Sequence, residues 1–277
     1  MTHSCRPWSG CSGWPAYDHR LMASDPRSRL PTLAAGSLRS VTPCRRRLAR
    51  HLDPDDRPYS PTNDGRFRLG KAIDEAIRAA HDSLDIAAPD AEFDDLLVRS
   101  VPSDLGLEEA RRFSVALDHY SELAESRPMK LHPNAGETLE RPSRNSTWAL
   151  RASMGLLLHN DAGDIELRHV NTSPAPSPLP QHCSDSDLAR VALLGPATLG
   201  RTVRVVELWT EGIATAVVHE VTPEAVTALR DRLVDAVDQA REHPNDVTPG
   251  WWCTTCPAIA GCPAIPATRF ETVLGHF

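Results

Sequence analysis

Apolar residues recur at helical spacing over long stretches in the first half of the chain. Leu69 and Ile73 fall on one face of a helix that begins near residue 66, and residues 107–125 repeat the same pattern. A turn-rich stretch, residues 53–65, precedes the first of these helices. The pattern therefore predicts a helical segment over residues 66–127.

The pattern changes after residue 146 to short runs rich in branched and alternating apolar residues. Residues 146–173 predict two strands joined by the turn Asn160-Asp161-Ala162-Gly163. Residues 201–209 and 213–221 predict a second pair of strands. Four prolines between residues 174 and 180 prevent the first pair from continuing as a central strand.

Two further helices are expected among these strands. Residues 185–194 predict a short helix, and Thr222-Pro223-Glu224 opens a longer one that runs to about Arg241, because proline is favoured in the first turn. Residues 146–242 then form the core sheet and helices of an α/β fold. Its mixed central sheet is flanked by helices, and residues 66–127 form a helical insertion.

The N-terminal region divides at about residue 34. Residues 1–33 are rich in Pro, Ser, Gly and Arg and lack a sustained apolar period, so a disordered leader is expected. Residues 34–52 have apolar spacing that fits a helix carrying Cys44, with Pro43 near a helix start or a kink. Residues 34–277 are expected to form a single domain.

Charge and hydropathy narrow the classes of partner. The chain has 277 residues, of which 40% are hydrophobic, so it can bury one large core. No apolar run approaches the roughly 20 residues that a membrane span needs, and the N-terminus lacks the continuous apolar segment of a secretion signal. No membrane partner is expected, and the protein is expected to be cytoplasmic.

Contact with nucleic acid would have to come from a local basic patch. The formal net charge is −7, which gives the whole molecule no long-range attraction to nucleic acid. The candidate patch contains four arginines, Arg45, Arg46, Arg47 and Arg50. The alternative for the same residues is a solvated helix face paired with nearby acids such as Asp53.

The cysteines indicate a metal site. Cys253, Cys256 and Cys262 form the pattern C-x2-C-x5-C within residues 250–265, a segment we call the clip, and two of the three are followed directly by proline. A closed thiolate site normally takes four ligands, and Cys44 is the best remaining candidate. Cys183 is the competitor, and two cysteines of the leader are further alternatives, namely Cys5 and Cys11. The spacing favours a 4Fe–4S cluster, with structural zinc as the alternative.

These features together resemble the iron–sulfur members of the RecB-like PD-(D/E)XK nuclease superfamily, a group that includes CRISPR-associated exonucleases. The resemblance covers roughly residues 34–262 and rests most on the cysteine spacing. It implies a restriction-endonuclease-like core. It also implies that Cys44 joins the three clip cysteines in holding a 4Fe–4S cluster, which staples the clip to the N-terminal helix beside the DNA path.

The catalytic motifs of that superfamily match this chain only in part. Its G-x-x-[VI]-H helix corresponds to Gly70 and Ile73, but the histidine position holds Asp74. Its strand aspartate falls at Gly155, which offers no ligand.

The remaining motif positions are altered as well. The [DE]-x-K strand corresponds to His169 and Asn171, and the Q-x-x-x-Y helix to Asp187 and Val191. Metal-dependent phosphodiester hydrolysis needs adjacent carboxylates for Mg²⁺ or Mn²⁺ and a lysine near the attacking water. The resemblance therefore implies a nuclease fold that keeps its cluster and has lost its catalytic centre.

Three functions follow as hypotheses. The first is a catalytically degenerate protein that binds nucleic acid, with DNA the first candidate, or a partner protein. The second is an active exonuclease whose metal ligands have moved to neighbouring carboxylates, namely Asp161, Asp164 and Glu166. The third is a redox or iron sensor in which cluster loss releases the clip.

Overall fold

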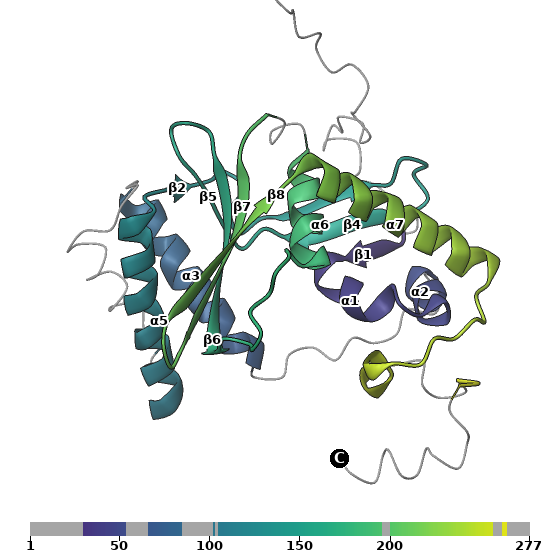
Figure 1. Ribbon diagram of the computed structural model, residues 1–277, viewed down its shortest axis with the longest axis horizontal. Coiled ribbons are helices and arrows are strands. Elements are labelled where there is room, and N and C mark those ends of the chain that lie inside the picture. The colour runs from purple at the N-terminus through teal and green to yellow at the C-terminus, as the bar shows by residue number, and fades with distance from the viewer. Residues whose placement is uncertain are drawn as a thin grey trace, which may run out of the picture.

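A computed structural model describes residues 30–53, 66–84, 102, 105–195, 200–256 and 262–264. Within this part the protein is α/β, with six α-helices and two mixed sheets of three and five strands packed together. Figure 1 shows helices on both sides of the larger sheet. None of the described helices is long and apolar enough to cross a bilayer.

The larger sheet has the strand order β2-β5-β6-β7-β8. Its strands are β2 (Lys130–Leu131), β5 (Leu156–His159), β6 (Ile165–Pro174), β7 (Val203–Glu211) and β8 (Thr215–Val221). β6 and β7 run parallel and are connected through α6 (Asp185–Leu194), whereas the other neighbours are antiparallel. The predicted hairpin, helix and second strand pair are confirmed.

The tip of the β5–β6 hairpin also follows the prediction. The Gly163 N–H donates to the Asn160 carbonyl at 2.9 Å, and Gly163 has φ 85°, a conformation that glycine adopts without steric cost.

The prediction of one central sheet is wrong, because β1 (Thr32–Ala34), β4 (Ala149–Ser153) and β3 (Thr138–Pro142) form a separate sheet in the order β1-β4-β3. Residues 146–173 contain three strands rather than two, since the chain bends at Gly155, where φ is 54°. β1 also begins two residues before the expected domain boundary.

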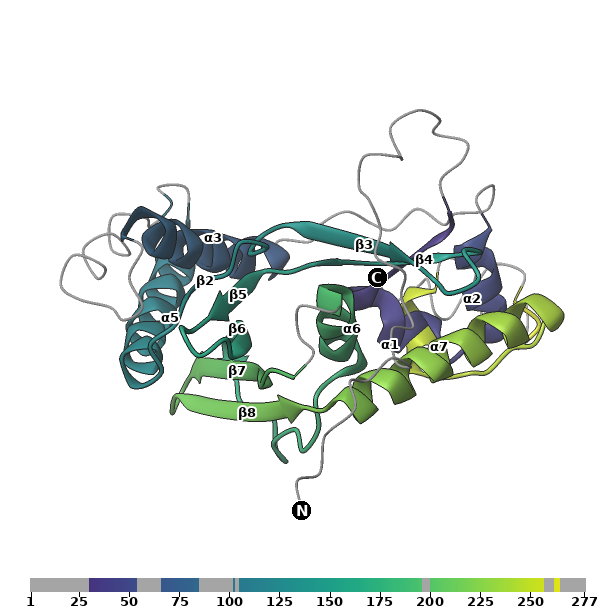
Figure 2. The same ribbon diagram turned by 90° about the horizontal axis from the view of Figure 1, so that it is seen from above.

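Two apolar cores lie on opposite faces of the larger sheet. α3 (Arg66–Leu84) and α5 (Leu107–Ser126) pack on one face around Phe113 and Tyr120, as the apolar periodicity predicted. α6 and α7 (Pro223–Glu242) pack on the other face, together with the N-terminal helices. Figure 2 shows α6 lying between the larger sheet and the smaller one.

The helix predicted over residues 34–52 is interrupted at Pro43, where a helix start or a kink was expected. The structure has a 3₁₀ turn, η3 (Ala35–Ser37), then α1 (Leu38–Val41) and, after a break, α2 (Arg45–Leu52). Pro43 explains the break, because proline has no N–H to donate within a helix and its ring clashes with the preceding turn. Cys44 is consequently the extended residue that precedes α2, with φ −121° and ψ 111°.

Candidate functional site

Four cysteines from the two ends of the domain line one pocket. They are Cys44, Cys253, Cys256 and Cys262, and all four are free thiols. Among the described residues, no Asp, Glu or His lines the pocket, whose other charged residues are Arg46 and Arg47. We call this site the cysteine pocket. The structure thus brings together the four positions that the sequence nominated.

Local turns position the thiols. η5 (Trp251–Thr255) is a 3₁₀ helix in which the Cys253 N–H donates to the Gly250 carbonyl and the Cys256 N–H to the Cys253 carbonyl, at 3.0 and 3.1 Å. Cys44 is 7% exposed. In the described part of the chain, no three Cys, His, Asp or Glu side chains form a group that could hold a single metal ion as they stand.

The arginines of the first turn of α2 hold the C-terminal segment. Arg45 donates to Asp246 and Gln239, each at 2.8 Å, Arg46 donates to Asn245 at 3.2 Å, and Arg47 donates to the Trp252 carbonyl at 2.7 Å. We call these contacts of Arg45, Arg46 and Arg47 the arginine clasp. Figures 1 and 2 both place η5 beside α2. Arg50 lies in the last turn of the same helix.

The sequence offered two interpretations of these arginines, nucleic-acid contact and pairing with nearby acids such as Asp53, and neither anticipated the clasp. The four partners of the clasp lie about 200 residues away, and three of them are uncharged: the side-chain amides of Gln239 and Asn245 and the backbone carbonyl of Trp252. Uncharged partners give no charge pattern that a sequence could show.

Cys183 lies outside the cysteine pocket. It packs against the core on the α6 side of the larger sheet. Burial, and then the nearby carboxylates of Asp187 and Glu207, raise the pKa of the Cys183 thiol to about 12. A thiol in that environment is a poor thiolate ligand. The two leader cysteines, Cys5 and Cys11, lie outside the described residues.

A second cluster of polar side chains surrounds Gly155. Asp74 comes from α3, His169 from β6, and Asp187 and Arg190 from α6. The pairing of Leu156 with Arg168 places Gly155 opposite His169, just beyond the end of the β5–β6 ladder. A Cβ at Gly155 would lie 3.9 Å from the Asp74 Oδ2. We call this cluster the Gly155 centre.

Asp187 is the hub of the Gly155 centre. Its Oδ1 lies 2.7 Å from the His169 Nε2 and 2.7 Å from the Arg190 Nη1, and the Ser184 hydroxyl donates to its Oδ2 at 2.6 Å. Burial alone would raise the pKa of this carboxyl, but the hydrogen bonds from His169 and Ser184 and the charge of Arg190 hold the pKa well below its usual value.

Asp74 has the opposite electrostatic environment. Burial raises the pKa of its carboxyl, although the charges of His169, Arg78 and Arg190 partly oppose this rise. The structure thus brings together the helix, aspartate and acidic positions of the nuclease motifs, occupied here by one carboxyl, one glycine and one imidazole. That set is a weak match for Mg²⁺, which prefers several oxygen ligands.

The other motif positions lie close by in the fold but supply no ligand. Asn171 follows His169 on the same face of β6, opposite Trp209, and its carbonyl accepts a hydrogen bond from Thr210 at 3.1 Å. Val191 lies on α6 and is buried in the hydrophobic core. Arg78 and Arg190 were missed by sequence reasoning, because an isolated arginine on a helix matches no motif.

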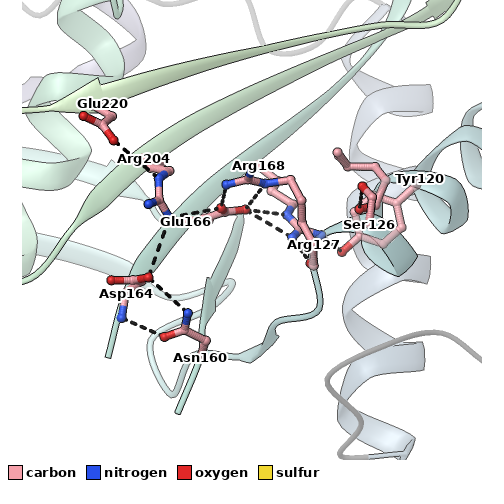
Figure 3. A network of polar contacts seen from close by, with 10 residues as sticks. Tyr120, Ser126, Arg127, Asn160, Asp164, Glu166, Arg168, Arg204 and Glu220 are labelled. Atoms are coloured by element: carbon pink, nitrogen blue, oxygen red, sulfur yellow. Dashed lines mark hydrogen bonds and ion pairs between the residues drawn. The ribbon is translucent and has the colours of Figure 1, made fainter. Parts of the chain in front are cut away.

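Two carboxylates of the relocated-ligand hypothesis, Asp164 and Glu166, lie close to arginines. Glu166, which is 1% exposed, pairs with Arg127 and Arg168, and Arg204 lies 3.7 Å from Asp164 and 3.8 Å from Glu166 (Figure 3). Asn160 also donates to Asp164 at 3.1 Å.

This network lies on the sheet face that α5 covers, since Arg168 also reaches Tyr120. His169, the next residue on β6, faces the other way. Asp161 sits at the hairpin tip and is 92% exposed.

Comparison with protein-family models gives no match, and comparison with curated protein sequences gives no significant match.

The Asp187 hub predicts acid sensitivity. Because the folded pKa of Asp187 is lowered, its contribution to stability is present above the ordinary value of about 3.9 and is lost as the pH falls below it. Asp187→Asn should lower the free energy of unfolding at pH 7 by about 1.5–3 kcal/mol and flatten its decline between pH 5 and pH 2. Denaturant titrations at several pH values would measure both effects.

The matched control is Asp238→Asn, which removes an exposed carboxylate of α7. Equal pH profiles for Asp187→Asn and the wild-type protein would contradict the assignment of the hub.

Proposed function

We propose that the protein is a catalytically degenerate relative of the RecB-like PD-(D/E)XK nucleases that carries a 4Fe–4S cluster and binds nucleic acid without cutting it. The observation that carries this proposal is the convergence of Cys44 with the three clip cysteines on one pocket. These positions come from opposite ends of the domain, as the resemblance requires.

The residues of the cysteine pocket suit an iron–sulfur cluster. Its donor set is all sulfur, which is the set that 4Fe–4S clusters use, and structural zinc is the alternative for the same set. A cluster would supply a structural cross-link and the capacity to exchange an electron. Arg46 and Arg47 line the pocket and would offset the negative charge of the thiolates.

The Gly155 centre supports binding without hydrolysis. A nuclease of this kind needs carboxylates where this chain has Gly155 and His169, and a lysine where it has Asn171. The nearest carboxylate, Asp187, is held by His169, Ser184 and Arg190. Asp74 alone could not hold a catalytic Mg²⁺ firmly or generate a metal-bound hydroxide.

The arginine clasp offers a phosphate-binding surface that the C-terminal segment partly covers. The Arg45 side chain is 39% exposed, so the guanidinium that holds Asp246 could hold a phosphate instead. Binding through such contacts is electrostatic and independent of sequence. Asp246 would then compete with the nucleic-acid backbone for the same guanidinium.

The deciding experiment is anaerobic purification followed by a visible absorption spectrum and assays for iron and acid-labile sulfide. The proposal predicts a broad absorption near 400 nm, about four irons and about four sulfides per chain. Zinc in place of iron, or no metal, would overturn the cluster. An absence of salt-sensitive binding of the holoprotein to DNA or RNA would overturn the nucleic-acid part and favour a partner protein.

The arginine clasp also favours a second candidate function, a redox or iron sensor in which loss of the cluster releases the clip. The clasp and the cysteine pocket share Arg46, Arg47 and Trp252. Loss of a cluster would therefore weaken the attachment of the C-terminal segment to α2 and uncover the arginines. Stronger nucleic-acid binding by the metal-free protein than by the holoprotein would support this function over constitutive binding.

Nucleic-acid affinity is expected to depend on the clasp arginines. Replacing Arg45, Arg46 and Arg47 together by alanine should weaken binding equally across sequences. It should also reduce the slope of log affinity against log salt by about 2–3, since each phosphate contact contributes about 0.7–0.9. Fluorescence anisotropy with two unrelated oligonucleotides at several salt concentrations would measure this.

Asp246→Ala is the matched control, because it frees the Arg45 guanidinium without removing it. It should bind at least as tightly as the wild-type protein. Metal content must be measured in each variant, because the same arginines attach the segment that carries the cysteines.

A further inference from the structure

The Gly155 centre contains three basic side chains, Arg78, Arg190 and His169, but only two carboxyl groups, Asp74 and Asp187. A Cβ at Gly136 would fall on the guanidinium of Arg78, so this arginine lies directly over a residue that has no side chain. The Gly136 N–H donates to the Gly155 carbonyl at 2.8 Å, which joins the two glycines into one backbone platform. Both have positive φ, 73° and 54°. Arg78 and Asp74, one helical turn apart on α3, lie against this platform.

Arg78 has no partner within the described residues. It makes no hydrogen bond or ion pair there, and its Nε is shielded from solvent without an acceptor. A buried donor without an acceptor costs free energy, and a guanidinium offers five donors that suit the oxygens of a phosphate.

Arg190 supplies a second set of donors to the same centre. It uses Nη1 on Asp187 and Ser186 and Nε on the Ser153 carbonyl, which leaves Nη2 without an acceptor among the described residues. The Arg190 and His169 side chains are 22% and 26% exposed, so both can reach a ligand from solvent. Arg78 lies over Gly136, Arg190 donates to the Ser153 carbonyl, and His169 lies opposite Gly155, so the three groups surround the same bend of the chain.

We infer that the Gly155 centre is a metal-independent oxyanion site in which Arg78 and Arg190 bind a phosphate group over the Gly136–Gly155 platform. The inference rests on the proposed function and specifies its ligand at this centre. In a nuclease a divalent cation held by carboxylates neutralises the phosphate. Here the protein's own cations are in position for that role, and a Cβ at Gly155 would meet only the Asp74 Oδ2 within 4 Å.

The charge balance supports an anion rather than a cation. Asp187 is already paired with His169 and Arg190, and burial raises the pKa of Asp74. The charge of Arg78 acts on Asp74 but forms no ion pair within the described residues.

Calorimetric titration of the holoprotein with inorganic phosphate, in a buffer free of divalent metals, tests the inference. The wild-type protein should bind phosphate saturably, and Arg78→Ala should weaken binding by at least tenfold, the usual effect of losing a charge-assisted hydrogen-bonding group of about 1.5–3 kcal/mol. The matched control is Arg111→Ala, which removes an equal charge from an exposed position on α5 and should change affinity by less than about twofold.

Competition with a short single-stranded oligonucleotide distinguishes the source of the phosphate. Displacement of the oligonucleotide by phosphate identifies a nucleic-acid backbone as the ligand, and phosphate binding without displacement identifies a free phosphate. Absence of saturable phosphate binding, or equal affinities of the wild-type protein and Arg78→Ala, would overturn the inference.

If circular dichroism shows that Arg78→Ala does not fold, Arg78→Gln provides the same comparison. Because the readout is phosphate binding without divalent metal, its failure would leave the iron and sulfide assay, and the cluster it tests, unaffected.

Discussion

Replacing Cys44 by serine is expected to remove most of the bound iron and sulfide and to lower the free energy of unfolding by several kcal/mol. Cys44 shares the cysteine pocket with Cys253, Cys256 and Cys262, and no His, Asp or Glu of the described residues lines it. A serine hydroxyl is a far weaker ligand than a thiolate for iron or zinc, so three cysteines would remain where four are needed.

The expected loss of stability follows from linkage. A metal or cluster that binds only the folded chain adds its binding free energy to folding. A metal or cluster bound by both Cys44 and Cys253 would close a loop of about 200 residues. A cross-link over a loop of that length contributes about 5 kcal/mol in chain-entropy estimates. Denaturant titration under anaerobic conditions, with metal analysis of the same samples, measures both effects.

Cys183→Ser is the matched control. Cys183 is also a partly buried free thiol, but it packs against the core and lies outside the cysteine pocket. Its variant should keep full metal content. Full occupancy in Cys44→Ser together with loss in Cys183→Ser would show that the fourth ligand had been assigned to the wrong cysteine.

The elements that the sequence predicted well are those whose packing face has a regular period. α3, α5 and α7 show apolar residues at helical spacing, and β7 and β8 are separated by a glycine turn. Local chemistry decides these elements, and their bounds agree with the expected ones to within a few residues. The same applies to α6, which Ser184 caps by accepting the Asp187 N–H.

The second sheet could not be predicted because its strands are short and its pairing is non-local. β1 has three residues and pairs in parallel with β4, more than 110 residues away. β3 contains charged residues and Pro142 and shows no regular alternation. The separation of β4 from β5 depends on the positive φ of Gly155, and a lone glycine in an apolar run does not reveal that conformation.

The candidate sites were predictable to different degrees. The three clip cysteines are close in sequence, so their spacing alone pointed to a shared ligand. The place of Cys44 beside them depends on the packing of α2 against α7 and on the arginine clasp. At the Gly155 centre the resemblance nominated Asp74, Gly155 and His169, whereas Arg78 and Arg190 emerged only from the geometry.

Neither Mg²⁺ nor Mn²⁺ is expected to support DNA cleavage by the wild-type protein. The Gly155 centre offers one carboxyl whose pKa is raised, Asp74, and one that is fully engaged, Asp187. Two of the neighbouring acids of the relocated-ligand hypothesis, Asp164 and Glu166, are held by Arg127, Arg168 and Arg204, and the third, Asp161, is exposed at the hairpin tip. Cleavage that is removed by Asp164→Ala but unaffected by Asn171→Ala would show that a working centre exists elsewhere.

Introducing a carboxylate at Gly155 should convert the Gly155 centre from the proposed anion site to a cation site. Aspartate tolerates the left-handed backbone at Gly155 better than most residues, and its Cβ would lie 3.9 Å from the Asp74 Oδ2. Two facing carboxylates beside an imidazole suit Mn²⁺, so Gly155→Asp should raise Mn²⁺ affinity by roughly tenfold or more, since affinity rises with ligand charge.

Electron paramagnetic resonance of free Mn²⁺ would measure this gain. Gly200→Asp is the control, since it adds the same charge at another glycine of positive φ that has open space around it. Equal Mn²⁺ affinities for Gly155→Asp, Gly200→Asp and the wild-type protein would mean that Asp74, Gly155 and His169 do not surround a common point. In that event the absence of cleavage would need an explanation other than a lost metal ligand.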